Sequence, residues 1–408
     1  MSDTQMADIL VNSDNKKNGT KKPKSSSKET KDKDKFHGLS EVQLKEAYMI
    51  MLRSRMNDDR VDTLIKQGKA TFLISGSGHE GIQVAMGMAM QPGKDWLYTY
   101  YRDNAICMTM GVTVEQMMQH SMGKATDTFS GGRQMPMTIG SQQFRIPTAS
   151  LTTGSQYLEA AGAALAEVYK GTDAVAYAGG GEGSTSEGEF WEAVNWASRD
   201  KLPVVFVIQN NKFAISVPVS QQTAGGSIYK ATEGFVGLTR VDIDGTDFLA
   251  SYATCKEAVE HARAGNGPTL IHANVVRLRS HSASDAQEKY RSKEDLAEDT
   301  KKDPLLLLEN ILIENNIITK EDAERIRKEV FEEVMKIADE VWQQPAPDAS
   351  TVEDYVFCPA DQQTPIEYEK SVPSGEPVVM VDAINHALHE EMEKNPNMIV
   401  YGEDVQDN

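Results

Sequence analysis

Two short apolar segments, separated by a glycine-rich turn and a helix-like segment, constrain most strongly what this chain can fold into. Val204-Val205-Phe206-Val207-Ile208 is apolar at five consecutive positions, and residues 174–178 are also largely apolar. A strand that is apolar on both faces needs cover on both faces, and a parallel sheet between helices provides it. The pattern therefore predicts an α/β fold, with a mostly parallel sheet and helices on both faces.

Helix-like and strand-like segments alternate around this pair. Apolar residues recur at helical spacing after Ser40, a residue suited to capping a helix, and Thr319-x-x-Asp322 resembles a capping box. The predicted helices cover residues 40–68, 156–170, 186–199, 252–264, a segment starting at Asp303-Pro304, and a segment from Thr319 to near Trp342. The predicted strands cover residues 174–178, 203–208 and 269–276.

The chain divides into four predicted parts. Residues 1–39 form a Lys-rich tail, which we expect to be disordered because it has almost no apolar residues. Residues 40–342 form the main domain, and residues 343–377 form a Pro-rich linker. Residues 378–408 resume an apolar pattern, with a predicted helix and a strand at residues 398–400. We expect this last part to be the truncated start of a second domain.

Composition narrows the classes of partner. The net charge of -19 argues against nucleic acid, and no apolar run approaches the roughly 18 residues of a membrane span. Cys107, Cys255 and Cys358 are odd in number and far apart, so the sequence supports no disulfide framework. The tail lacks Arg and has no apolar segment, which argues against a targeting peptide. We expect a cytoplasmic protein that binds neither nucleic acid nor membrane.

A glycine-rich turn with one acidic residue follows the first predicted strand. It reads Gly179-Gly180-Gly181-Glu182-Gly183-Ser184, and Asn211 lies 29 residues after Glu182, beyond the next strand. Glycines let a backbone approach a phosphate, but a carboxylate beside a phosphate needs a cation between them. Carboxylate and amide oxygens suit Mg²⁺. Since adjacent parallel strands end in one crevice, we expect Glu182 and Asn211 to share a metal site there.

This combination resembles the thiamine-diphosphate family, whose signature is Gly-Asp-Gly followed about 30 residues later by Asn-Asn. Residues 40–357 are similar to the α subunit of the first, decarboxylating component of the 2-oxo acid dehydrogenase complexes. Glu182 within Gly-Glu-Gly, and Gly-Arg-Gln-Met-Pro at residues 132–136, resemble the branched-chain member. Pyruvate enzymes typically have Gly-Gly-Ser-Met-His at the second motif. The resemblance implies a thiamine-diphosphate-binding fold and oxidative decarboxylation of branched-chain 2-oxo acids.

The resemblance also implies roles for individual residues. The implied Mg²⁺ ligands are Glu182, Asn211 and the carbonyl of Phe213. The implied contacts to thiamine diphosphate are Tyr101, Arg102, Gly181, Gly183, Ser184, Gln209, Arg277 and His281. Gln209 stands where the branched-chain enzyme has an Arg, so one phosphate contact differs. Ser150, Ser155 and Gln156 lie near a segment that, in the mitochondrial homologue, contacts the cofactor and a monovalent cation.

His281 is the implied catalytic residue. By resemblance it lies at the mouth of the site and assists transfer of the acyl group to lipoamide. An imidazole can donate a hydrogen bond or a proton near neutral pH.

The resemblance implies partners as well: a β subunit or β region, in a heterotetramer or a fused homodimer, a lipoylated acyltransferase component and a 2-oxo acid substrate. Residues 379–405 resemble the opening of the β subunit, and the family's activating glutamate lies further along than Glu403. We therefore expect activity only when a β region is supplied. Two alternatives remain: the α subunit of a pyruvate or acetoin dehydrogenase, and a non-catalytic assembly fragment whose basic tail docks on the acyltransferase.

Overall fold

A computed structural model describes residues 35–358, 376–402 and 405. Most of the predicted tail, residues 359–375 of the predicted linker and Glu403 lie outside the described residues. Contacts divide the chain into two units, residues 1–352 and 353–408, and each is treated by itself.

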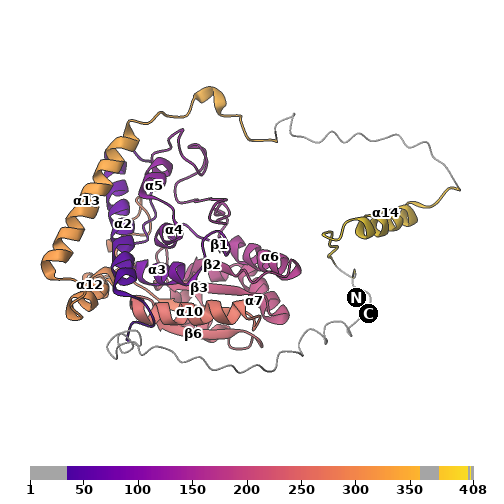
Figure 1. Cartoon of the computed structure of the whole chain (residues 1–408), viewed down its shortest axis with the longest axis horizontal. Helices are drawn as coiled ribbons and strands as arrows, with labels where there is room; N and C mark the ends of the chain where they lie inside the picture. The colour runs from indigo at the N-terminus through magenta and orange to yellow at the C-terminus, as the bar shows by residue number, and fades with distance from the viewer. Residues whose placement is uncertain (1–34, 359–375, 403–404, 406–408) are drawn as a thin grey trace, which may run out of the picture. The chain divides into compact units, whose positions relative to one another are not determined.

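The first unit is built on a parallel sheet of five strands, in the order β1-β2-β3-β7-β6 (Figure 1). The strands are β1 Trp96–Tyr98, β2 Ala176–Gly181, β3 Val204–Asn210, β6 Thr239–Asp244 and β7 Thr269–Asn274. A small antiparallel pair, β4 Phe213–Ala214 and β5 Val217–Pro218, follows β3. The predicted strands correspond to β2, β3 and β7, which form the centre of the sheet.

Successive residues of the central strands point into two separate apolar cores. Val204, Phe206 and Ile208 are buried against Tyr157 and Phe190, which lie on α6 and α7. The alternate residues of the same strand belong to the other core, with side chains from α2, α3 and α10. Each face of the sheet is thus covered by helices, which confirms the predicted α/β fold with a mostly parallel sheet.

Helices cover the sheet and extend beyond it (Figure 1). Their bounds are α2 Glu41–Lys66, α3 Glu80–Ala89, α4 Asn104–Met110, α5 Val114–Ser121, α6 Ser155–Tyr169, α7 Gly188–Asp200, α8 Val219–Gln222, α9 Ile228–Ala231, α10 Phe248–Arg263, α11 Lys293–Lys301, α12 Pro304–Glu314, α13 Lys320–Trp342 and, in the second unit, α14 Met380–Lys394. Short 3-10 turns lie at Glu182–Ser186, Ala224–Gly226, Gln287–Lys289 and Ala349–Thr351. Thr319 forms the predicted capping box of α13, and Ser40, predicted as the N-cap of α2, forms a capping box with Gln43. None of the helices in the described ranges is long and apolar enough to cross a membrane.

Three features differ from the sequence-based expectations. Phe36 and Leu39 are buried in the core, so packing begins before Ser40. Residues 398–400 carry no strand, and the prediction of one there was wrong; a strand needs a hydrogen-bonded neighbour, and none is present among the described residues of that unit. The edge strands β1 and β6 were not predicted, because β1 is short and β6 is partly exposed.

Gly180 offers a test of how tightly the turn after β2 is packed. A Cβ atom at this position would collide with the hydroxyl of Tyr157 on α6, whereas a Cβ at Gly162 within α6 would meet nothing within 4 Å. We expect Gly180→Ala to destabilise the protein by about 1–3 kcal/mol through overpacking. Gly162→Ala should instead stabilise it by about 0.5–1 kcal/mol, because Ala favours a helix. Urea unfolding measures both, and equal effects of the two substitutions would contradict this packing.

Candidate active site

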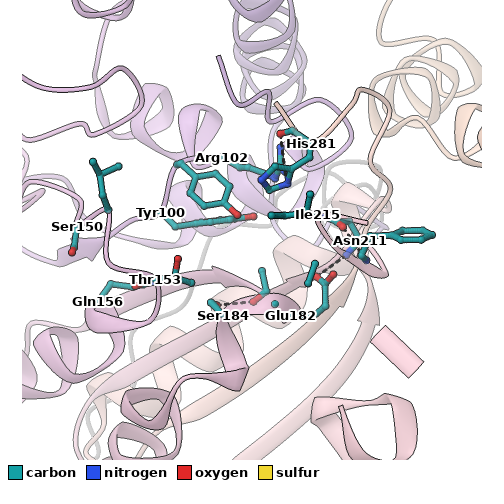
Figure 2. Close-up of a pocket in the computed structure, with 16 residues that line it drawn as sticks. Tyr100, Arg102, Ser150, Thr153, Gln156, Glu182, Ser184, Asn211, Ile215 and His281 are labelled. Atoms are coloured by element: carbon teal, nitrogen blue, oxygen red, sulfur yellow. Dashed lines mark hydrogen bonds between the residues drawn. The ribbon is translucent and has the colours of Figure 1, made fainter. Parts of the chain in front are cut away.

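The parallel register of β2 and β3 brings the predicted metal ligands together. Gly181 pairs with Gln209, so Glu182 and Asn211 follow the two strands at the same edge of the sheet. A cavity of about 260 Å³ opens at this edge. Its lining is Tyr100, Tyr101, Arg102, Ser150, Leu151, Thr153, Gln156, Gly181, Glu182, Gly183, Ser184, Asn211, Phe213, Ala214, Ile215 and His281. Figure 2 shows Arg102 and His281 across the cavity from Glu182 and Ser184.

Glu182 is a buried carboxylate with an unsatisfied oxygen. Only 1% of the residue is exposed. Its Oε2 accepts a hydrogen bond of 3.2 Å from the backbone N–H of Asn211, while its Oε1 is buried without a hydrogen-bond partner. Burial raises the pKa of Glu182 to about 7, although backbone hydrogen bonds and the charges of Arg102 and Arg277 oppose this shift. A cation bound at Oε1 would supply the missing partner and favour the ionised form.

Asn211 and Phe213 lie on a tight turn that begins where β3 ends. The Oδ1 of Asn211 accepts a hydrogen bond of 3.3 Å from the backbone N–H of Phe213. Between them, Lys212 has a φ of 72°, in the left-handed region. The ring of Phe213 lies 5.6 Å from the guanidinium carbon of Arg277 and 5.1 Å from that of Arg291. The side chain is thus engaged in packing, which leaves the backbone of Phe213 as the part available to a ligand.

Arg102 and His281 lie on the opposite wall of the cavity, where the charged guanidinium hydrogen-bonds a neutral imidazole. The Nη1 of Arg102 donates to the carbonyl of Ser75 at 2.6 Å, and its Nη2 donates to His281 Nδ1 at 3.0 Å. A guanidinium can only donate, so Nδ1 must accept and the imidazole proton resides on Nε2. Burial lowers the pKa of His281 to about 4, with added repulsion from Arg102 and Arg277. The neutral ring has an Nε2–H that can donate a hydrogen bond, whereas the lowered pKa disfavours the second proton that proton donation near neutral pH would need.

The remaining predicted cofactor residues of the turn also line the cavity. Gly183 packs closely, since a Cβ there would lie 3.0 Å from the Cβ of Ala214. The Oγ of Ser184 donates to the carbonyl of Gly181 at 2.7 Å and lies 2.6 Å from the hydroxyl of Tyr157. Tyr101 stacks edge-on with His281, at a centroid distance of 6.1 Å. The contacts of Gly183 and Ser184 hold the backbone of the turn across the cavity from Arg102 (Figure 2).

Two predicted cofactor residues do not line the cavity. Gln209 is fully buried, and its amide contacts other side chains beneath the cavity. Arg277 is also buried and donates to the carbonyl of Ile215 at 2.9 Å and to the hydroxyl of Tyr290 at 2.8 Å. Of the three residues near the predicted cofactor and monovalent-cation segment, Ser150 and Gln156 line the cavity. Ser155 does not line it, and its Oγ donates to the carbonyl of Thr152.

Four further residues at the site were not predicted from the sequence. Tyr100, Thr153 and Ile215 line the cavity, and His79 lies behind Asn211. For His79, the sequence feature that could have indicated a functional loop is the run of small residues before it, Ser75-Gly76-Ser77-Gly78. Gly78 has a φ of 98°, and a Cβ there would collide with the carbonyl of Val276, so only glycine lets this loop approach the end of β7.

The residues present fit Mg²⁺ and a diphosphate. The orphaned Oε1 of Glu182 and the amide of Asn211 are oxygen donors of the kind Mg²⁺ prefers. Over the described ranges, no group of three or more His, Cys, Asp or Glu is arranged to hold a metal. The protein therefore offers an incomplete set of ligands, which diphosphate oxygens would complete. Arg102 supplies a positive charge on the facing wall.

The fold and this site define a class of enzyme that binds a phosphorylated cofactor at the carboxyl edge of a parallel sheet. Residues 48–350 match the family model of the dehydrogenase E1 component, and the chain belongs to this family of thiamine-diphosphate-dependent 2-oxo acid dehydrogenases. It is 37% identical to the 2-oxoisovalerate dehydrogenase subunit alpha of Bacillus subtilis, over 78% of this chain and 97% of that protein. It is 35% identical to the pyruvate dehydrogenase E1 component subunit alpha of Mycoplasma pneumoniae, over 72% of this chain and 79% of that protein. The pyruvate dehydrogenase E1 component subunit alpha of Bacillus subtilis is 34% identical to it, over 72% of this chain and 77% of that protein.

The buried carboxylate predicts a pH-dependent stability for the metal-free protein. Because the pKa of Glu182 is raised to about 7 from an ordinary 4.5, the folded state holds a proton that the unfolded state releases. Its stabilising contribution is complete below pH 4.5 and is lost as the pH rises through 7. At pH 8 we expect Glu182→Gln to raise the free energy of unfolding by about 2–3 kcal/mol, and the gain should vanish near pH 4.5.

Urea unfolding in EDTA between pH 4.5 and 8 measures this difference. The matched control is Glu192→Gln, at an exposed position on α7. A gain for Glu182→Gln that does not depend on pH, or one shared by the control, would contradict the burial argument.

Proposed function

We propose that this chain is the α part of a 2-oxo acid dehydrogenase that binds Mg²⁺ and thiamine diphosphate and acts on branched-chain substrates. One observation carries the proposal. A buried carboxylate with an orphaned oxygen, Glu182, lies beside Asn211 in a cavity that faces Arg102. Such a carboxylate is costly to bury unless a cation is bound, and the parallel sheet places it where α/β proteins bind phosphorylated ligands.

Each wall of the cavity has a proposed role. Glu182, Asn211 and the carbonyl of Phe213 would hold Mg²⁺, and Arg102 would bind the diphosphate by charge. The backbone of Gly183 and Ser184 would approach the same phosphates. When bound, thiamine diphosphate supplies a carbon nucleophile that adds to the keto group and takes up the electron pair released with carbon dioxide.

His281 would act after decarboxylation. Its Nδ1 is held by Arg102 at 3.0 Å, so its Nε2–H can donate a hydrogen bond toward the cavity. We propose that this hydrogen bond orients the acyl group for transfer to a lipoyl arm on an acyltransferase component.

A β region would complete the site. Among the described residues that line the cavity, Glu182 is the one carboxylate, and the proposal assigns it to Mg²⁺. No carboxylate of this cavity is then left to activate the aminopyrimidine of the cofactor. That residue would come from a β subunit or a fused β region, as the resemblance implies.

Two motifs support branched-chain substrates. Glu182 lies in Gly-Glu-Gly, and residues 132–136 read Gly-Arg-Gln-Met-Pro, both of which resemble the branched-chain type. The similarity to a 2-oxoisovalerate dehydrogenase subunit agrees, but pyruvate dehydrogenase subunits are nearly as similar. The α subunit of a pyruvate or acetoin dehydrogenase is therefore the second candidate, and a non-catalytic assembly fragment is the third.

Cofactor binding is the first test. Glu182→Ala and Asn211→Ala should each weaken Mg²⁺-dependent binding of thiamine diphosphate at least about tenfold, because even the outer partners of metal ligands are worth 10–100-fold. Isothermal titration of the full chain measures this. Metal binding should also release a proton from Glu182 at pH 6 but not at pH 8, since the pKa of Glu182 is about 7. The exposed variant Glu192→Gln is the control, and unchanged binding by both alanine variants would remove the cofactor claim.

Substrate preference is the second test. With a β subunit supplied, we expect kcat/KM for 3-methyl-2-oxobutanoate to exceed that for pyruvate about tenfold or more, because added methyl groups in an apolar pocket are worth that much. Leu151 and Ile215 give the cavity apolar lining for such a side chain. The reverse order would favour the pyruvate or acetoin enzyme. Cofactor binding without turnover of either substrate would favour an assembly fragment.

A further inference from the structure

His79 lies directly behind the proposed metal ligand Asn211. It is fully buried in the loop before α3, and its Nε2 lies 3.4 Å from Asn211 Nδ2. Its other ring nitrogen, Nδ1, lies 2.9 Å from the Oε1 of Gln209. His79 therefore connects the buried amide of Gln209 to the amide that faces the cavity.

Backbone hydrogen bonds fix the orientation of the first amide in this chain of polar groups, that of Gln83. Gln83 on α3 accepts from the N–H of Ala105 through Oε1, at 3.1 Å, and donates to the carbonyl of Arg102 through Nε2, at 2.9 Å. A backbone N–H can only donate and a carbonyl can only accept, so the amide of Gln83 has a single possible orientation. The Nε2 of Gln83 also donates to the Oε1 of Gln209, at 2.9 Å.

Gln209 is fixed from both ends. Its Oε1 receives the N–H of Gln83, so its Nε2 must point the other way, where it donates to Asp103 Oδ1 at 2.7 Å. Asp103 also accepts hydrogen bonds from the hydroxyl of Tyr177 at 2.9 Å and from the N–H of Tyr100 at 3.2 Å. Every partner of Asp103 is a donor, which suits a carboxylate, and no inversion of the Gln209 amide satisfies both of its neighbours.

The tautomer of His79 follows from Gln209. Since the Oε1 of Gln209 can only accept, Nδ1 of His79 carries the proton and Nε2 is an acceptor. The partners of the buried ring are the amides of Gln209 and Asn211 and the hydroxyl of Tyr100, 3.3 Å from Nδ1; none of these three is a carboxylate that would hold a second proton. An acceptor at Nε2 selects the amino end of the Asn211 amide as its neighbour, which leaves Oδ1 as the end that a cation can use.

We propose that His79 is a positioning residue that fixes the amide of Asn211, so that its oxygen rather than its amino group is offered to Mg²⁺. The inference rests on the proposed function, because it concerns the same cation. The backbone N–H of Phe213, which donates to Oδ1 at 3.3 Å, favours the same orientation, and His79 adds an acceptor at the amino end. Without that acceptor the amide is held by one long hydrogen bond and can be rotated by half a turn, and an amino group aimed at Mg²⁺ is repulsive. Gln209 thereby has a role in support of the metal site, at a position from which it does not touch the cavity.

The hydrogen-bonded chain from Gln83 through Gln209 and His79 to Asn211 is called the relay below. The test interrupts it at two points. His79→Leu removes the acceptor at Asn211, and Gln209→Met removes the acceptor that sets the tautomer of His79 without touching Asn211. Each should weaken the Mg²⁺ affinity of the full chain about tenfold, measured by isothermal titration with saturating thiamine diphosphate. If His79→Leu fails to fold, Gln209→Met carries the same test.

Tyr177→Phe is the matched control. It removes a hydroxyl that hydrogen-bonds Asp103 at 2.9 Å and lies 3.4 Å from Gln209 Nε2, but it keeps the hydrogen bonds of Gln209 to Gln83, His79 and Asp103. It should lower the Tm of the metal-free protein and leave the Mg²⁺ affinity unchanged. Equal Mg²⁺ affinity in wild type and Gln209→Met, or an equal loss in Tyr177→Phe, would overturn the positioning role. A wild type that binds no better than Glu182→Ala would instead refute the proposed function, so the two failures are distinguishable.

Discussion

An ionisable carboxylate held out of water organises this molecule. Glu182 is buried at the end of β2 with Oε1 unpartnered, and that arrangement opposes its ionisation. A protein retains such a group when something outside the chain compensates for it. Much around it is consistent with that reading: Asn211 supplies a second oxygen at the same edge, and Arg102 places a positive charge on the facing wall.

The sheet makes this arrangement possible because it is parallel and covered on both faces. The pairing of Gly181 with Gln209 sets the register, and the residues after them therefore emerge side by side. Alternate residues of β3 pack into two separate cores, which holds that register against slippage. Gly180 leaves room for the hydroxyl of Tyr157, so the turn after β2 lies close against α6. Stability of the cores and geometry of the site thus depend on the same few residues.

Local patterns were sufficient for the central sheet and for the placement of Glu182 and Asn211 at the same edge of it. The apolar run of β3, the glycines around Glu182 and the capping boxes at Ser40 and Thr319 all act within one element or one turn. His79 could not be predicted in this way, because it meets Gln209 across 130 residues. For Gln209, the resemblance implied a position beside the cofactor, whereas its partners Gln83 and Asp103 hold it beneath the cavity. Long-range partners decide where a polar side chain points, and a single sequence does not list them.

The electrostatics of the site run against those of the chain as a whole. The net charge is -19, but the groups that lower the pKa of His281, besides burial, are the guanidiniums of Arg102 and Arg277. An anion held beside Arg102 offsets part of that charge, so the proton affinity of His281 rises when the anion binds. Ionisation of Glu182 gains in the same way from a cation at Oε1. Filling the site with a cation and an anion together would therefore shift both residues toward their charged forms.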